Sequence, residues 1–265
     1  MNIMISIVIP VYNSESTIVR TLSSILSQTY LDYEVIAVND GSSDSSLDLL
    51  LDFKERFLGD RMKIINQENS GVSKARNIGI LKSSGKWIAL LDSDDEWLPN
   101  KLEEQMKVLE SKPEIDFLGC NLLHKPVIFF FKKIKSLKKV VFWELLLKMY
   151  PQTSTAIFKK EIIKRVGLYD ETMTHAEDGH FWIRICLECQ FYFMPEELVI
   201  YGGGKPSFGT SGLAANLSKM HDGEKKNLFY VFDKGYINYL AYTILGIYSE
   251  MKYLRRVFII RYLRK

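Results

Sequence analysis

The chain has 265 residues, of which 47% are hydrophobic and 25% are charged, and its net charge is +3. These values are ordinary for globular proteins and exclude a disordered chain, a collagen-like repeat and a small disulfide-stabilised domain. The charge is too small for an obligate nucleic-acid binder, so we expect no nucleic-acid partner. The six basic residues of 251–265 exceed the net charge, so residues 1–250 carry a net −3. We therefore expect the basic tail to meet an anionic partner.

The cysteines and the N-terminal segment bear on the cellular compartment. Cys120, Cys186 and Cys189 are too few for a disulfide framework and favour a reducing cytoplasm. The apolar run at the N-terminus lacks a basic region and a small-residue cleavage site, so it predicts a first strand rather than a signal peptide. No apolar stretch approaches about 18 consecutive residues, and we expect no ordinary transmembrane helix.

The first 120 residues alternate between apolar runs and segments with helical spacing of apolar residues. The runs predict strands at 5–12, 33–40, 62–67, 86–92 and 116–121. Helices are predicted near 18–26, 47–53, 73–83 and 99–111. Such alternation is typical of an α/β fold with a mostly parallel sheet, right-handed crossovers and helices on its faces.

The second half of the chain is less regular. It predicts a strand and short helix within 154–167, a helix at 177–189, one or two strands at 191–201, a glycine-rich loop at 202–212 and an apolar helix from Gly235 into the basic tail. We expect a catalytic domain over 1–210, with halves at 1–100 and 101–210. A C-terminal helical extension is expected over 211–265.

Polar and acidic residues follow three of the predicted strands. In an open parallel sheet, ligands bind at the carboxyl ends of the strands. Here those ends are Pro10-Val11-Tyr12-Asn13, Asn39-Asp40-Gly41-Ser42 and Asp92-Ser93-Asp94-Asp95. Clustered carboxylates are unfavourable unless a cation neutralises them. All-oxygen ligation by Asp92 and Asp94 favours Mg²⁺ or Mn²⁺ over zinc.

Five segments, in order along residues 3–200, resemble the motifs of the family 2 glycosyltransferases. They are SIVIPVYN (6–13), VNDGSSD (38–44), NSGVSKARNIGI (69–80), ALLDSDDEWLP (89–99) and AEDGHFWIR (176–184). The resemblance implies a Rossmann-like GT-A domain that takes a sugar from a nucleotide-diphospho-sugar and inverts its anomeric carbon. It also implies a D-x-D metal motif and an aspartate base in the E-D motif.

The resemblance assigns roles to particular residues. Asp178, beside Glu177, would remove the proton from the acceptor hydroxyl. Asp40 would accept the N–H of a uracil ring. Asp94 would hold the metal, with Asp92 near the metal or the ribose. The remaining nucleotide-sugar contacts would come from Pro10, Val11, Tyr12, Asn13, Gly71, Lys74, Arg76 and Ser93, and His221 is a further candidate metal ligand.

Purely structural interpretations compete with these roles. Asp40 with its glycine and serine could form only a turn. Asp95 and Glu96 could cap the helix after Pro99, since acids favour helix N-termini. The Glu177-Asp178 pair could do the same for its own helix, Arg76 could simply pair with an acid, and His221 could be a surface histidine.

We expect a UDP-sugar donor and a bacterial surface-glycan acceptor: lipopolysaccharide, capsule or a lipid-linked oligosaccharide. The basic C-terminus, and the lysines and phenylalanines of 125–139, predict contact with the inner face of the cell membrane, with a dimerising helix as the main rival. The absence of a Q-x-x-R-W signature disfavours a processive synthase. The alternatives are a catalytically silent GT-A-like binding or scaffold protein and a sugar nucleotidyltransferase, although the latter's glycine-rich signature is missing after the first strand.

Overall fold

The computed structural model describes residues 4–129, 132–204 and 215–263. Its strands are β1 (Ile5–Val11), β2 (Tyr33–Asp40), β3 (Met62–Gln67), β4 (Trp87–Leu90), β5 (Glu96–Trp97), β6 (Phe117–Leu122), β7 (Ile128–Phe129), β8 (Lys132–Lys133), β9 (Lys138–Lys139), β10 (Ile157–Lys159) and β11 (Phe191–Ile200). Its helices are α1 (Ile18–Leu26), α2 (Ser46–Phe53), α3 (Val72–Lys82), α4 (Lys101–Ser111), α5 (Phe142–Leu147), α6 (Ile163–Val166), α7 (Glu177–Glu188), α8 (Leu217–Asp233) and α9 (Tyr239–Phe258).

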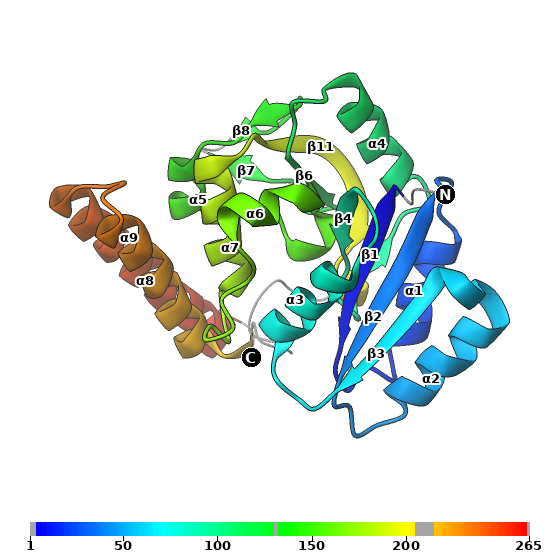
Figure 1. Cartoon of the computed structure of the whole chain (residues 1–265). Coiled ribbons are helices and arrows are strands. Elements are labelled where there is room, and N and C mark those ends of the chain that lie inside the picture. The colour runs from blue at the N-terminus through cyan, green and yellow to red at the C-terminus, as the bar shows by residue number, and fades with distance from the viewer. Residues whose placement is uncertain (1–3, 130–131, 205–214, 264–265) are drawn as a thin grey trace.

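One curled sheet runs through the molecule in the order β3-β2-β1-β4-β10-β6-β11-β5, with β9 paired to β11 (Figure 1). Strands β3, β2, β1 and β4 are parallel, as the alternation of strands and helices predicts. Strand β10 then enters antiparallel between β4 and β6, and β11 runs parallel to β6. The predicted α/β fold is confirmed, and the sheet is mixed beyond its first four strands.

The first strand separates two hydrophobic cores because its side chains alternate between the faces of the sheet. Ile5, Ile7 and Ile9 pack with residues of α1, α2 and α4 on one face. Val8 packs on the other face, with residues of α3, α6 and α7. All seven residues of β1 are buried, which is the behaviour expected of a strand covered on both sides.

Helix α3 lies unusually close to β1. A Cβ atom built on Gly79 would stand 2.3 Å from Cγ1 of Val8, far inside van der Waals contact. Only the missing side chain lets the helix backbone approach the strand this closely. Arg76 lies one turn earlier on the same helix, so this packing helps to fix where its side chain begins.

The C-terminal helices α8 and α9 form an antiparallel pair on the side of the molecule away from β3 (Figure 1). The helical extension is confirmed, but the sequence prediction covered α9 alone and missed α8. Most of the predicted 202–212 loop, and the predicted boundary between 210 and 211, lie outside the described residues. Among the residues that are described, no helix is both long and apolar enough to cross a bilayer.

Candidate active site

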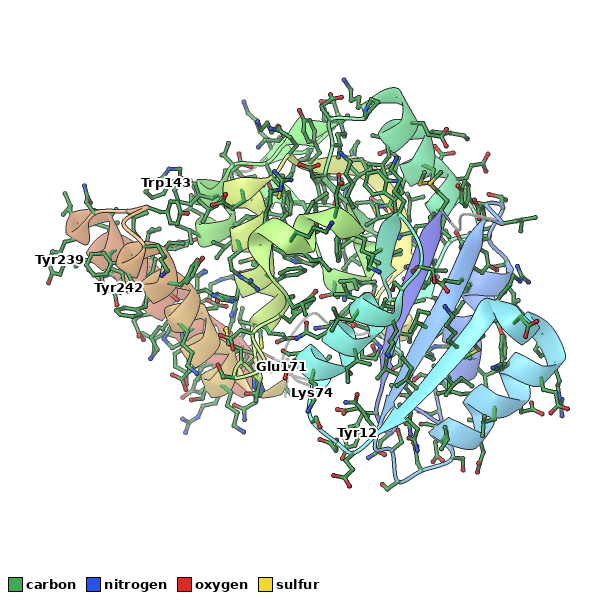
Figure 2. The ribbon with its side chains drawn as sticks, viewed as in Figure 1. Tyr12, Lys74, Trp143, Glu171, Tyr239 and Tyr242 are labelled. Carbon is green, nitrogen blue, oxygen red and sulfur yellow. The ribbon has the colours of Figure 1, made fainter. Side chains whose placement is uncertain are left out.

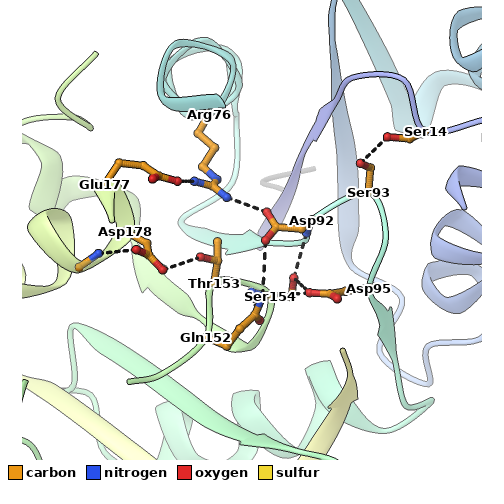
Figure 3. A network of polar contacts seen from close by, with 11 residues as sticks. Ser14, Arg76, Asp92, Ser93, Asp95, Gln152, Thr153, Ser154, Glu177 and Asp178 are labelled. Carbon is orange, nitrogen blue, oxygen red and sulfur yellow. Dashed lines mark hydrogen bonds and ion pairs between the residues drawn. The ribbon is translucent and has the colours of Figure 1, made fainter. Parts of the chain in front are cut away.

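Arg76 connects two acidic residues that are far apart in the sequence (Figure 3). Its Nη2 atom donates to Oδ1 of Asp92 at 2.7 Å, and its Nη1 atom donates to Oε1 of Glu177 at 2.8 Å. The Arg76 and Glu177 side chains are only 5% and 6% exposed, whereas Asp92 is 24% exposed. The guanidinium also lies over the ring of Tyr169. Arg76 therefore aligns the end of β4 with the start of α7.

Asp178 lies beside this ion-pair network and is partly exposed. Its Oδ1 atom accepts from its neighbour's backbone, Gly179 N, at 2.7 Å, and the hydroxyl of Thr153 lies 3.5 Å from Oδ2. Desolvation, with added repulsion from Glu177, raises the pKa of Asp178 to about 6. A carboxylate with this pKa is ionised at neutral pH and is a stronger base than an ordinary aspartate.

Asp95 is fully buried and does not cap the following helix, so the capping interpretation is wrong for this residue. Its Oδ2 atom accepts from the hydroxyl of Ser154 at 2.5 Å and from Nε2 of Gln152 at 3.0 Å. Its Oδ1 atom accepts from the backbone N–H of Gly202 at 2.6 Å. The carboxylate thereby ties the acidic loop after β4 to two segments of the second half of the chain.

The environment of Asp95 is also electrostatically unusual. Desolvation, together with repulsion from Asp92 and Asp94, raises the pKa of Asp95 to about 7. Three aspartates within four residues thus share one edge of the sheet, and Arg76 pairs with Asp92. A bound cation would reduce the repulsion between these carboxylates.

Residues 152–154 belong to this site, although sequence reasoning did not select them. Ser154 Oγ accepts from the backbone N–H of Asp92 at 2.9 Å and donates to Asp95, so one hydroxyl orders the whole acidic loop. Gln152 reaches the same two carboxylates. The run Gln-Thr-Ser-Thr after Pro151 is a polar signal between apolar segments, but nothing in its spacing indicates a partner near residue 92.

Asp40 holds the loop that precedes α3. Its carboxylate accepts from Nε2 of Gln67 at 2.6 Å and from the backbone N–H groups of Ser70 and Gly71 at 2.8 and 2.9 Å. A carboxylate has about four acceptor sites, so three protein donors leave one for a ligand. Asp40 thus holds a separate loop rather than only its own turn, and its predicted contact with a uracil ring stays a prediction.

The end of β1 is tied to the neighbouring strand ends. Asn13 has a left-handed backbone (φ 47°), and its side chain accepts from the backbone N–H of Ser43 at 2.9 Å. The hydroxyls of Ser14 and Ser93 are 2.7 Å apart. Tyr12 is 53% exposed, so its ring is available to a flat ligand. Tyr12 and the exposed Lys74 both lie at the lower edge of the molecule in Figure 2, where the parallel strands end.

The other predicted residues divide into three groups. Pro10 and Val11 are buried in β1, so only their backbone atoms are available at the end of the strand. Asp94 is partly exposed beside Asp92, while Arg20 donates to its backbone carbonyl. His221 lies on α8, where Nε2 is 2.9 Å from Glu250 and the ring stacks on Tyr253 of α9. The structure thus gives His221 partners within the helix pair, and we leave it out of the proposed metal ligands.

The carboxylate oxygens at this site suit a hard divalent cation that the phosphates of a substrate also coordinate. Within the described ranges, no three His, Cys, Asp or Glu side chains are arranged to hold a metal by themselves. Oδ2 of Asp92 has only a 3.5 Å contact with Gln152, so this oxygen could coordinate a cation beside Asp94. One or two carboxylates plus substrate phosphates is the usual coordination of Mg²⁺ in nucleotide-dependent enzymes.

Solved structures with the same architecture include complexes with nucleotide sugars. S. aureus TarS 1–349, in complex with UDP-GlcNAc, aligns with a TM-score of 0.70 over 96% of this chain and 72% of that one, at 17% identity. The mannosyltransferase PcManGT of Pyrobaculum calidifontis, in complex with GDP-Man and Mn²⁺, aligns with a TM-score of 0.67 at 18% identity over 86% and 64%. At these identities the likeness establishes a GT-A glycosyltransferase fold.

Residues 6–167 match the sequence profile of glycosyl transferase family 2. The chain belongs to this family. It is 30% identical to an uncharacterized glycosyltransferase of Rickettsia typhi, over 74% of this chain and 63% of that protein. It is 31% identical to WfgD of Escherichia coli, a UDP-Glc:α-D-GlcNAc-diphosphoundecaprenol β-1,3-glucosyltransferase, over 69% of each chain. The chain spans 63, 63 and 26% of the lengths of three of its Rickettsia relatives.

Proposed function

We propose that this chain transfers a sugar from a UDP-sugar to a hydroxyl group and inverts the anomeric carbon. The observation that supports this most directly is Asp178. Its carboxylate has a pKa raised to about 6 and is partly exposed beside the Arg76–Glu177 ion pair. A base of this strength, next to strand ends that suit a nucleotide, fits a reaction that needs one proton removed.

In the proposed reaction, the acceptor oxygen attacks the anomeric carbon from the face opposite the diphosphate. The new C–O bond forms as the bond to the phosphate oxygen breaks, and UDP leaves. Asp178 takes the hydroxyl proton. Glu177 does not act as a second base, because its side chain is buried and paired with Arg76. It is a positioning residue that holds the guanidinium between the two halves of the site.

On the donor side, the exposed ring of Tyr12 would stack on the base, and Asp40 would accept its N–H. Asn13, Gly71, Lys74 and Ser93 border the same edge. Asp94 and Asp92 would hold Mn²⁺ or Mg²⁺, which when bound stabilises the negative charge that develops on the leaving diphosphate. Arg76 keeps Asp92 in place for that role through Oδ1 and leaves Oδ2 for the cation.

The acceptor is proposed to be a lipid-linked sugar of a bacterial surface glycan, at the cytoplasmic face of the cell membrane. This rests on the similarity to WfgD, whose name describes a diphosphoundecaprenol-linked acceptor. The C-terminal helices would contact the membrane surface, and pairing of two copies is the competing use of the same helices.

Turnover tests the proposal directly. Purified chain with Mn²⁺ would be incubated with UDP-glucose or UDP-GlcNAc and a GlcNAc-diphospho-lipid, and UDP release and the product's anomeric configuration would be measured. We expect metal-dependent release, a product of inverted configuration, and loss of turnover in Asp178→Asn with UDP binding retained. UDP binding without turnover of any UDP-sugar would instead favour the silent binding protein. A nucleoside triphosphate consumed together with a sugar phosphate would identify a nucleotidyltransferase.

A further inference from the structure

Helix α9 carries a continuous apolar stripe that nothing in the described structure covers. Its members recur at alternating spacings of four and three residues, which places them on one face of the helix. Each is between 55 and 67% exposed. They are Leu240, Ile244, Ile247, Met251, Leu254 and Phe258. We call these six residues the α9 stripe.

The opposite face of α9 is already used. Leu245 and Ser249 are buried against α8. Glu224 of α8 accepts from Arg256 at 2.6 Å and pairs with Lys252 at 3.4 Å. The inward-facing cations of α9 are thus both paired with Glu224 within the helix pair, and the stripe faces away from the protein.

We infer that the α9 stripe lies on the surface of an anionic bilayer, with Arg255 and Arg261 at the lipid headgroups. These two arginines are exposed. At 100° per residue, Arg255 falls on one edge of the stripe, on the same side as the exposed Tyr248. Arg261 and the exposed Tyr262 follow in the π-helical turn Ile259–Leu263 that continues α9. Apolar side chains flanked by arginine and tyrosine are the composition of helices that lie in the membrane interface.

The residue pattern of α9 fits pairing with a second copy of the chain less well than it fits a bilayer surface. A coiled-coil seam is narrow and has opposite charges along its flanks. Here the apolar arc is broadened by Tyr248, and the regular spacing of the stripe ends at Phe258, where α9 passes into the π-helical turn Ile259–Leu263. The only acid in α9 is Glu250, which is bound to His221. Two copies would therefore bring arginines against arginines, whereas anionic lipid headgroups complement them.

The apolar surface continues beyond the start of α9. Tyr239 is 72% exposed, and Tyr236 and Trp143 are 40 and 42% exposed. Phe142, next to Trp143, contacts the ring of Tyr236, so α5 and the α8–α9 turn adjoin. Figure 2 places Trp143 and Tyr239 at the same end of the molecule. Aromatic residues at this end would extend the bilayer contact across α5.

The helix pair is fixed directly to the segment that carries the proposed base. Asn227 of α8 is buried and donates to the carbonyl of Ala176 at 3.0 Å. A Cβ atom on Gly223 would lie 2.3 Å from the carbonyl oxygen of His175, so α8 touches this backbone closely. Asp178 lies two residues after Ala176. A bilayer that holds α9 would therefore hold the base at a set height above the lipid surface. This step rests on the proposed function; the docking itself does not.

Vesicle co-sedimentation of the full chain tests the docking. We expect sedimentation with phosphatidylcholine vesicles containing about one third phosphatidylglycerol, weak sedimentation with phosphatidylcholine alone, and weakening by high salt. Ile247→Glu/Met251→Glu should reduce binding at least tenfold. Leu51→Glu/Leu81→Glu, which alters equally exposed apolar residues on α2 and α3, should bind as the wild type does. Circular dichroism would confirm that both double variants are folded.

Equal sedimentation of the stripe variant and the wild type would overturn the inference. A second result would also overturn it: the wild type is a dimer in vesicle-free buffer, the stripe variant is a monomer, and the wild type does not sediment with vesicles. A further arm separates docking from function: the stripe variant should lose transfer to an acceptor embedded in vesicles but keep transfer to a water-soluble acceptor. Docking without any turnover would contradict only the proposed function, and turnover without docking would contradict only this inference.

Discussion

Arg76 and Asp92 form an ion pair of 2.7 Å that uses one oxygen of the aspartate and leaves the other turned toward Gln152. The same guanidinium pairs with Glu177, so one positive charge is shared between two carboxylates. Because the protein supplies few further carboxylates, a metal bound here would take much of its coordination from the diphosphate of the proposed donor.

We therefore expect Mn²⁺ to bind weakly alone and at least tenfold more tightly when UDP is present. Linkage requires that Mn²⁺ tighten UDP binding by the same factor. Calorimetric titration of each ligand in the presence and absence of the other would measure both factors. Asp94→Asn should abolish the coupling while leaving metal-free UDP binding unchanged. Tight Mn²⁺ binding without nucleotide would contradict this view of the site.

Replacing Arg76 should be among the most destabilising single changes in this chain. Arg76→Ala leaves the buried Glu177 carboxylate without its cation, a loss that typically costs about 3–5 kcal/mol. For a chain of this size we expect the melting temperature to fall by on the order of 10 °C. Lys107→Ala, which removes a solvent-exposed ion pair with Glu103 and Glu104, should change it by roughly 2 °C or less. Similar melting temperatures for the two variants would show that the buried pair is not structural.

The pH dependence of transfer should follow the proposed base. Asp178 acts as a base only when ionised, so kcat/KM should rise with pH through about 6 and then level off. Asp178→Asn should lower kcat by on the order of 10²–10⁴-fold and remove this limb. Thr153→Val, which removes the hydroxyl 3.5 Å from the carboxylate, should shift the limb without abolishing activity. A wild-type profile that is flat between pH 5 and 7 would exclude Asp178 as the base.

Asp95 should make the metal-free protein less stable as the pH rises. Its pKa is raised to about 7 in the folded chain, whereas an unfolded aspartate has a pKa of about 3.9. Between these values the folded state holds a proton that the unfolded state has lost. Its stability should therefore fall by up to about 1.4 kcal/mol per pH unit across this range and level off above about pH 7. Denaturant unfolding from pH 4 to 8 would measure the slope. Asp95→Asn should flatten it, and Asp48→Asn, at an exposed position on α2, should not.

Asn227 should influence catalysis from α8 without touching the donor. Its bond to Ala176 supports a residue with left-handed backbone (φ 55°) directly before Glu177 and Asp178. Such a conformation is costly for alanine and needs support from its surroundings. We expect Asn227→Ala to lower kcat several-fold with UDP affinity unchanged, and Lys226→Ala, at an exposed neighbour, to have no effect. Equal loss of UDP affinity and kcat would indicate general unfolding instead.

The sequence predicts residues 1–100 well because each of their elements has a local pattern. The strands β2 and β3 begin and end at the predicted residues. Strand β2 is buried throughout, whereas β3 is a partly exposed edge strand that the apolar Met62, Ile64 and Ile65 mark in the sequence. Strand β10 was predicted as a strand, but its antiparallel place between β4 and β6 depends on partners about 40 to 70 residues away. Helix α8 was missed because charged residues and Gly223 interrupt its apolar pattern.

The site residues likewise divide into those that sequence motifs predict and those that they do not. Arg76, Asp92, Glu177 and Asp178 were selected from motifs, and the structure brings them together. Ser154 and Gln152 were not selected, because their relation to Asp95 is a contact across nearly 60 residues with no local signature. Asp95 was interpreted as an exposed helix cap, since its burial depends on a segment that sequence periodicity cannot place.

The contact between Gly79 and Val8 limits how this protein can be redesigned. Any larger residue at 79 would act as a wedge between α3 and β1 and move the helix outward. The same wedge would draw Arg76 away from Asp92 and Glu177 and separate the two halves of the site. Changes aimed at the proposed donor site are therefore better made at the exposed rim around Tyr12 and Lys74, where side chains can change size without moving a backbone.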